Sequence, residues 1–133
     1  MKINYQSLEK KIDLKFKNKD LLVQALTHKS FNPNENNEKI EFLGDRVLGL
    51  VIAKKLLEIY PGEKEGILDK KFASLVNKKT CLDIAKKINL ASYVKTFNPN
   101  NKKIKIEDKI ISDSCEALVG AIYLDKGFTT VEK

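Results

Sequence analysis

The stretch that decides the fold lies at residues 37–50 and reads NEKIEFLGDRVLGL. It opens a long apolar segment that runs to Tyr60, which predicts a buried helix rather than a surface one. Glu38, Glu41 and Asp45 recur at helical spacing, so their carboxylates share one face, each about one turn from the next. Burying acids on such a helix is costly unless a cation meets them. A divalent metal ion is the expected cation, because hard cations bind oxygen ligands.

A second stretch repeats this design at residues 108–125, which read DKIISDSCEALVGAIYLD. Asp113 and Glu116 lie three residues apart and therefore share a face of another largely apolar helix. If the two helices pack against each other, this pair meets Glu41 and Asp45 in one acidic centre. Four carboxylates in one place form a site for one or two Mg²⁺ ions.

Length, composition and charge bound the class of protein. The chain has 133 residues, 42% of them hydrophobic, which suits a single globular domain with a real core. Lysine and arginine number 25 against 18 acidic residues, a net charge of +7. The excess of lysine favours a polyanionic partner, and nucleic acid is preferred to a membrane surface because no basic amphipathic anchor stands out. Charge alone is weak support, since a lysine-rich surface also serves solubility.

Cysteine usage and targeting signals indicate the compartment. Cys81 and Cys115 lie far apart and fit no metal-finger spacing, so both are predicted to be small buried thiols in a reducing cytosol. The sequence begins without a signal-peptide pattern. Lys54 and Lys55 interrupt the apolar run at 47–57 too early for a membrane span. We expect a soluble, cytoplasmic protein with no membrane partner.

Helical patterning extends along the chain, and no sustained period-two pattern indicates a strand, so the expected fold class is all-α. The predicted helices lie at residues 5–13, 21–28, 37–60, 64–76, 78–88 and 108–125. Asn18 or Asp20 is the candidate N-cap of the second, and Gly127 is placed to end the last. Gly44 and Gly49 lie inside the third helix, where glycine costs about 1 kcal/mol relative to alanine. They suggest the close approach of another backbone, from a neighbouring helix or from a second subunit.

These residues resemble a known family. Residues 37–48 closely resemble the signature of the bacterial ribonuclease III endonuclease domain. Further matches are ALTHKS at 25–30, EG at 65–66, ASLV at 73–76, and 113–125 together with the glycine and phenylalanine at 127–128. The resemblance covers nearly the whole chain, and its first and last long motifs are specific.

The resemblance implies a fold and an activity. It implies a dimeric, all-α endonuclease domain over residues 1–133, with its last helix cut short and the usual C-terminal double-stranded-RNA-binding domain absent. It further implies a homodimer that hydrolyses double-stranded RNA to 5′-phosphate and 3′-hydroxyl ends in rRNA and mRNA processing. The implied cofactor is Mg²⁺, with Mn²⁺ as a substitute. The alternative from another class is a catalytically idle RNA-binding or scaffolding domain of the same fold. A carboxylate-bridged di-iron protein is disfavoured because the chain has no Glu-x-x-His pair.

The same resemblance implies roles for particular acids. The metal-binding carboxylates would be Glu41, Asp45, Asp113 and Glu116. Of these, Asp45 and Glu116 would be the catalytic residues. Lys109 lies four residues before Asp113 on the same helical face, and it is predicted to pair with an acid rather than a phosphate.

Residues near the implied dimer seam form a second group. Glu38 and Glu65 match two further acids of the cleft, although salt bridges across a subunit interface explain them equally well. Phe42 matches a residue that plugs into the partner subunit, against the alternative of packing in its own core. Gly44 beside it is assigned to the same interface.

Two positions depart from the family pattern. Arg46 stands where a small residue usually follows the signature aspartate, and Phe72 stands where an arginine is common. Neither change removes a metal ligand, but both are expected to alter the charge of the cleft or its contacts with RNA. His28, the only histidine, is predicted to be a hydrogen-bonding residue at a helix end rather than a catalytic base.

Overall fold

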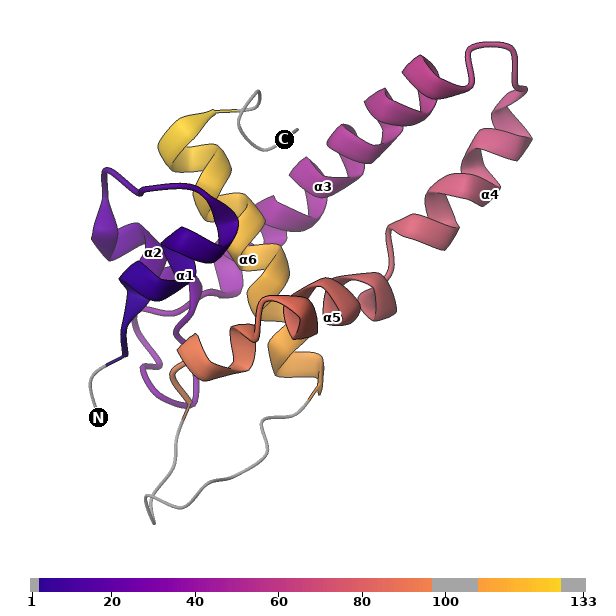
Figure 1. Cartoon of the computed structure of the whole chain (residues 1–133). Coiled ribbons are helices and arrows are strands. Elements are labelled where there is room, and N and C mark those ends of the chain that lie inside the picture. The colour runs from indigo at the N-terminus through magenta and orange to yellow at the C-terminus, as the bar shows by residue number, and fades with distance from the viewer. Residues whose placement is uncertain (1–2, 97–107, 128–133) are drawn as a thin grey trace.

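The structure is a computed structural model that describes residues 3–96 and 108–127. Its helices, shown in Figure 1, are α1 (Tyr5–Ile12), α2 (Lys19–Ala25), α3 (Glu38–Ile59), α4 (Glu65–Leu75), α5 (Lys78–Lys87), the 3₁₀ helix η1 (Leu90–Tyr93) and α6 (Asp108–Lys126). Within these described ranges the only β-type pairing is an isolated bridge between Thr27 and Lys95. The all-α prediction is therefore confirmed.

Helix α6 is the buried centre of the molecule. Every residue from Ile111 to Leu118 is buried, and α6 packs against α2, α3 and α5. The core that surrounds it includes Leu8 of α1, Leu22 of α2 and Leu90 of η1, all fully buried. Because apolar neighbours cover α6 on most sides, any polar group it carries on its buried face must find a partner there.

The crossing of α3 and α6 depends on two glycines. A Cβ added at Gly44 would lie 2.6 Å from the backbone carbonyl carbon of Glu116, and still closer to its oxygen. A Cβ added at Gly120 would lie 3.0 Å from the backbone nitrogen of Gly44. No side chain fits at either place, so the two backbones touch directly. The close approach predicted for Gly44 is therefore to α6 of its own chain, and its place at a subunit interface stays a prediction.

The second half of α3 departs from the prediction of a buried helix. Leu50, Leu57 and Ile59 are exposed, because only α4 accompanies α3 beyond its crossing with α6. Helix α4 contains no buried residue at all. The two helices form a hairpin that extends from the rest of the chain (Figure 1), so in a single chain several of their apolar side chains remain in contact with water, although Val51 and Leu56 are buried.

Local signals predicted most helix ends. The Asn18 side chain caps α2 by accepting a hydrogen bond from the backbone of Leu21 at 3.3 Å, which confirms that candidate. Gly127 has φ +90° and ends α6, as expected for a left-handed terminal residue. Helix η1 was not predicted from the sequence. None of the helices described here is long and apolar enough to cross a membrane.

Candidate active site

A cleft of about 500 Å³ opens where the first turns of α3 and α6 meet the start of α5. All four acids expected to bind metal line this cleft, so the structure brings them together as the sequence predicts. Four lysine and arginine residues also line it: Lys29, Arg46, Lys78 and Lys109. The cleft thus combines a cluster of carboxylates with cations supplied by the same chain.

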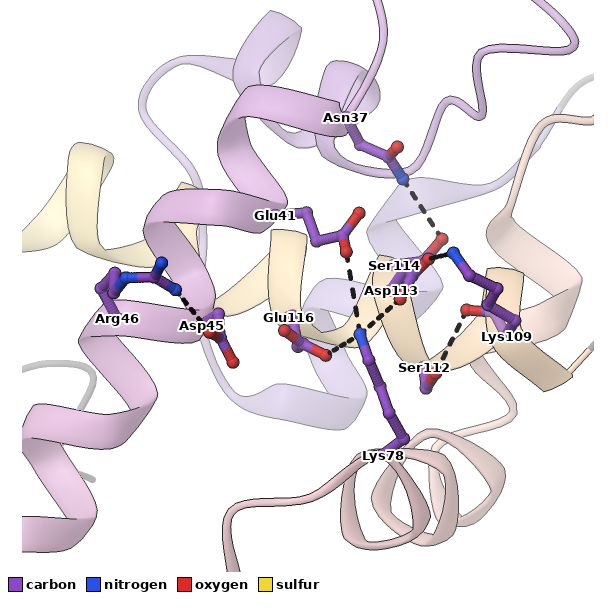
Figure 2. Close-up of polar contacts among 10 residues, drawn as sticks. All are labelled: Asn37, Glu41, Asp45, Arg46, Lys78, Lys109, Ser112, Asp113, Ser114 and Glu116. Carbon is purple, nitrogen blue, oxygen red and sulfur yellow. Dashed lines mark hydrogen bonds and ion pairs between the residues drawn. The ribbon is translucent and has the colours of Figure 1, made fainter.

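Three of the acids converge on one ammonium group. Lys78, the first residue of α5, places its Nζ 2.6 Å from Asp113 Oδ1, 2.5 Å from Glu116 Oε1 and 3.7 Å from Glu41 Oε1. Figure 2 shows the lysine reaching from α5 to a point between α3 and α6. Acids from two helices therefore share one cationic position.

The fourth acid has a different partner in the structure. The Asp45 carboxylate accepts a hydrogen bond from Arg46 Nη1 at 2.7 Å and is 46% exposed. The Arg46 guanidinium also stacks on the Phe42 ring, 4.5 Å from its centroid. The residue that departs from the family pattern thus neutralises an expected metal ligand and covers an exposed aromatic ring.

Helix packing holds the α6 acids in position. The Glu116 side chain is only 5% exposed, whereas Lys78 is 57% exposed, so the acid is fixed and the lysine reaches in from solvent. Asp113 also accepts a hydrogen bond from Lys109 Nζ at 2.8 Å, one turn away on α6. This contact confirms the prediction that Lys109 pairs with an acid.

The start of α3 is attached to α6 by a buried amide. Asn37 donates from Nδ2 to the backbone oxygen of Ala25 at 3.1 Å and to Ser114 Oγ at 3.4 Å. Asn37 and Ser114 are both buried, so these bonds satisfy polar groups that water does not reach. They place the first turn of α3, and with it Glu41, against the turn of α6 that carries the other acids.

The pKa values of the cluster follow from burial and mutual charge. Burial and the neighbouring charge of Asp113 raise the pKa of Glu41 to about 7, although Lys78 opposes the shift. Burial also raises the pKa of Glu116. Burial alone would raise the pKa of Asp113, but hydrogen bonds from Lys109 and Lys78 hold it below its usual range. The pKa of Lys78 is raised by its hydrogen bonds to the acids, which outweigh the lowering effect of burial. The carboxylates therefore need a nearby cation to remain charged together.

The donor set fits a hard divalent ion. Mg²⁺ takes oxygen ligands, and the Lys78 ammonium marks a point that oxygens of Glu41, Asp113 and Glu116 already face. In the described part of the chain no three acidic, histidine or cysteine side chains stand ready to hold an ion in their present positions. Figure 2 shows that the carboxylates of Glu41, Asp113 and Glu116 point toward Lys78, whereas the carboxylate of Asp45 pairs with Arg46.

The remaining predicted residues are more scattered. Glu38 lines the cleft, is exposed, and lies 3.6 Å from Lys29 in an ion pair. Glu65 begins α4 and does not line the cleft of its own chain. Phe42 is 63% exposed, which leaves its ring available to a partner. His28 hydrogen-bonds Ser30 through Nδ1 at 2.8 Å, in agreement with its predicted role beyond the end of α2.

Sequence reasoning missed Lys78. Lys78 forms a doublet with Lys79, a pattern that usually belongs to a solvated helix face. The nearest signal was the position of Lys78 after Asn77, which caps α5 by accepting a hydrogen bond from the backbone of Thr80 at 2.8 Å. That pattern marks the first residue of a helix, but it does not say which neighbours the residue meets.

The fold is all-helical, and the cleft at the crossing of α3 and α6 gathers four carboxylates. These features together define a helical protein with a carboxylate site suited to a divalent ion. Comparison with known proteins gives the family: the sequence model described as Ribonuclease-III-like matches residues 18–133. This chain therefore belongs to the Ribonuclease-III-like family.

Ribonuclease 3 of Pelagibacter ubique is 67% identical over 133 residues, covering 100% of this chain and 60% of the relative. Ribonuclease 3 of Aliarcobacter butzleri is 44% identical over 131 residues, covering 97% of this chain and 58% of the relative. The chain thus spans about three fifths of the length of these curated relatives.

Solved structures agree with the family. A structure of the nuclease domain of ribonuclease III from Campylobacter jejuni superposes with a TM-score of 0.88 at 41% identity, covering 97% of this chain and 91% of that chain. It is described as showing structural flexibility in a region involved in dimer formation. Dicer from Pichia stipitis matches with a TM-score of 0.66 at 25% identity, covering 86% of this chain and 49% of that chain.

Proposed function

We propose that this chain is the catalytic domain of an Mg²⁺-dependent endoribonuclease, which hydrolyses double-stranded RNA to 5′-phosphate and 3′-hydroxyl ends. The observation that carries the proposal is the meeting of Glu41, Asp113 and Glu116 around one cationic position in an open cleft. The high identity to relatives named Ribonuclease 3 supports the same activity. We propose that the natural substrates are rRNA and mRNA precursors in the cytoplasm.

Four carboxylates would hold the metal: Glu41, Asp45, Asp113 and Glu116. Bound there, Mg²⁺ would supply a nucleophile made from water at neutral pH and would offset charge on the scissile phosphate. The residues of the chain orient this centre. Buried Glu116 is aimed into the cleft by the packing of α6, and the Asn37 amide holds the first turn of α3 in register with it. Asp45 already lines the cleft and would complete the set once its carboxylate is released from Arg46.

A homodimer is the proposed assembly. The α3–α4 hairpin exposes Leu50, Leu57, Ile59 and Ile67, and exposed apolar side chains gathered on one part of a protein are typical of an interaction surface. Phe42, which lines the cleft, adds another exposed apolar side chain. Glu65, which lies away from the cleft of its own chain, is proposed to act only in such a dimer.

The test is cleavage of a long RNA duplex by wild type, Glu116→Gln and the control Glu63→Gln, with Mg²⁺ and with a chelator. Glu63 is an exposed acid outside the cleft. We expect Glu116→Gln to keep its circular dichroism and its dimer in light scattering while losing at least about 100-fold in rate, since one ligand of the centre is gone. Cleavage should be strongest at low salt, where phosphate contacts are least screened.

Undiminished cleavage by Glu116→Gln would exclude that residue from the chemistry. A wild-type chain that binds the duplex but leaves it uncut in Mg²⁺ would instead favour the idle RNA-binding alternative. A monomer at micromolar concentration would contradict the proposed assembly.

A further inference from the structure

Among the residues that line the cleft, Lys78 is the cation that contacts acids of both α3 and α6. Its Nζ contacts Glu41 of α3 and both Asp113 and Glu116 of α6, whereas Lys109 and Arg46 each pair with a single acid of their own helix. Opposite charge at such distances offsets the repulsion that the carboxylates would otherwise exert on one another. In the absence of metal, this lysine therefore holds the two helices' acids in one cluster.

The ammonium and a divalent ion compete for the same oxygens. Mg²⁺ requires its ligand oxygens at about 2.0–2.1 Å, so an ion at the point where the Asp113 and Glu116 oxygens converge would occupy the space that Lys78 Nζ now fills, 2.6 and 2.5 Å from them. The two cations also repel each other at that separation. One of them must leave for the other to bind.

The Lys78 side chain can move out of the cleft more easily than the acids can. The Lys78 side chain is 57% exposed and extends on a flexible aliphatic stem from the first residue of α5. The Glu116 side chain that it contacts is only 5% exposed. Moving Lys78 into solvent requires rotation about side-chain bonds alone. Moving the acids would require repacking of α6.

We propose that Lys78 is an internal counter-cation of the acidic centre, which keeps Glu41, Asp113 and Glu116 together in the metal-free protein and is displaced when a divalent ion binds. This inference rests on the proposed metal site. Two consequences follow by linkage: removing the charge at position 78 destabilises the metal-free protein and strengthens metal binding.

The test uses the full chain, stripped of metal with a chelator and titrated with Mg²⁺ alone at pH 8. Thermal unfolding and calorimetric titration are measured for wild type, Lys78→Met, the charge-retaining Lys78→Arg and the control Lys79→Met. Lys79 is the adjacent lysine, is exposed and is not among the residues that line the cleft. Methionine keeps the length of the side chain while removing its charge.

We expect Lys78→Met to lower the metal-free unfolding temperature and to bind Mg²⁺ about tenfold more tightly, which corresponds to about 1.4 kcal/mol. Its unfolding temperature should therefore rise more on adding Mg²⁺ than that of wild type. Lys78→Arg and Lys79→Met should remain close to wild type in both measurements. Mg²⁺ affinity that is unchanged or weaker in Lys78→Met would overturn the counter-cation role. A failure of wild type and every variant to bind Mg²⁺ would refute the metal site of the proposed function, and the displacement with it.

Discussion

The crossing of α3 and α6 allows a sharp test through Gly44→Ala. The substitution adds one methyl group at a point where the backbone of Glu116 already fills the space, with its carbonyl carbon 2.6 Å from the new atom. An ordinary contact between carbon atoms is about 3.5–4.0 Å, so the two helices must separate by about 1 Å. The clash is with backbone, which a change of rotamer cannot relieve.

The magnitude follows from two opposing terms. Overpacking a well-packed core costs about 1–3 kcal/mol, and a backbone clash lies at the upper end of that range. Alanine recovers about 1 kcal/mol relative to glycine through its better helix propensity. The net effect is a loss of about 2 kcal/mol in the free energy of unfolding. For a domain of this size each kcal/mol shifts the unfolding temperature by about 4 °C, so we expect a decrease of about 8 °C.

The assay is thermal unfolding followed by circular dichroism, with Gly66→Ala as the matched control. Gly66 also lies in a helix, and a Cβ added there would meet nothing within 4 Å. Gly66→Ala should therefore be neutral or stabilising by up to about 1 kcal/mol. If Gly44→Ala unfolds at or above the temperature of Gly66→Ala, then α3 and α6 do not make the backbone contact described here, and the geometry of the acidic centre loses its support.

Three further predictions concern single side chains. Because the pKa of Glu41 is raised to about 7 in the metal-free protein, Mg²⁺ must displace a proton at lower pH, so its affinity should weaken as pH falls below about 7. Glu41→Gln should reduce this pH dependence without abolishing it, because the pKa of Glu116 is raised as well; a titration at pH 6 and pH 8 that shows equal wild-type affinity would contradict the prediction. Phe42→Ala should weaken the dimer in light scattering while leaving the unfolding temperature of the monomer nearly unchanged, since the ring is 63% exposed in one chain; an unaltered dimer at every concentration would exclude Phe42 from the interface. Burial raises the pKa of Glu9, but hydrogen bonds from Lys19 and the Phe16 backbone outweigh it and hold the pKa below 4.5. The ionised Glu9 therefore stabilises the fold above about pH 4.5, and this contribution is lost as the pH falls through the lower pKa of Glu9 in the folded protein. Urea unfolding should find Glu9→Gln less stable than wild type by about 1–3 kcal/mol at pH 7 and closer to wild type at acidic pH.

The sequence by itself determined the local features of this protein. Helical periodicity put Glu41 and Asp45 on one face of α3, and Asp113 and Glu116 on one face of α6, because a period of 3.6 residues is a property of the backbone. The cap at Asn18 and the helix end at Gly127 were predicted for the same reason, since each depends on hydrogen bonds within a few residues.

Contacts between distant segments were decided by the tertiary structure alone. Gly44 signalled a close approach, but only packing made its neighbour α6 of the same chain rather than a second subunit. Apolar content predicted a buried α3, yet Leu50, Leu57 and Ile59 of its second half are exposed because α6 crosses only the first half. Lys78 lies 35 residues before Asp113, and no local pattern could bring its charge to the acids. Spacing along a helix sets which side chains share a face, whereas the faces that meet depend on how the whole chain buries its apolar surface.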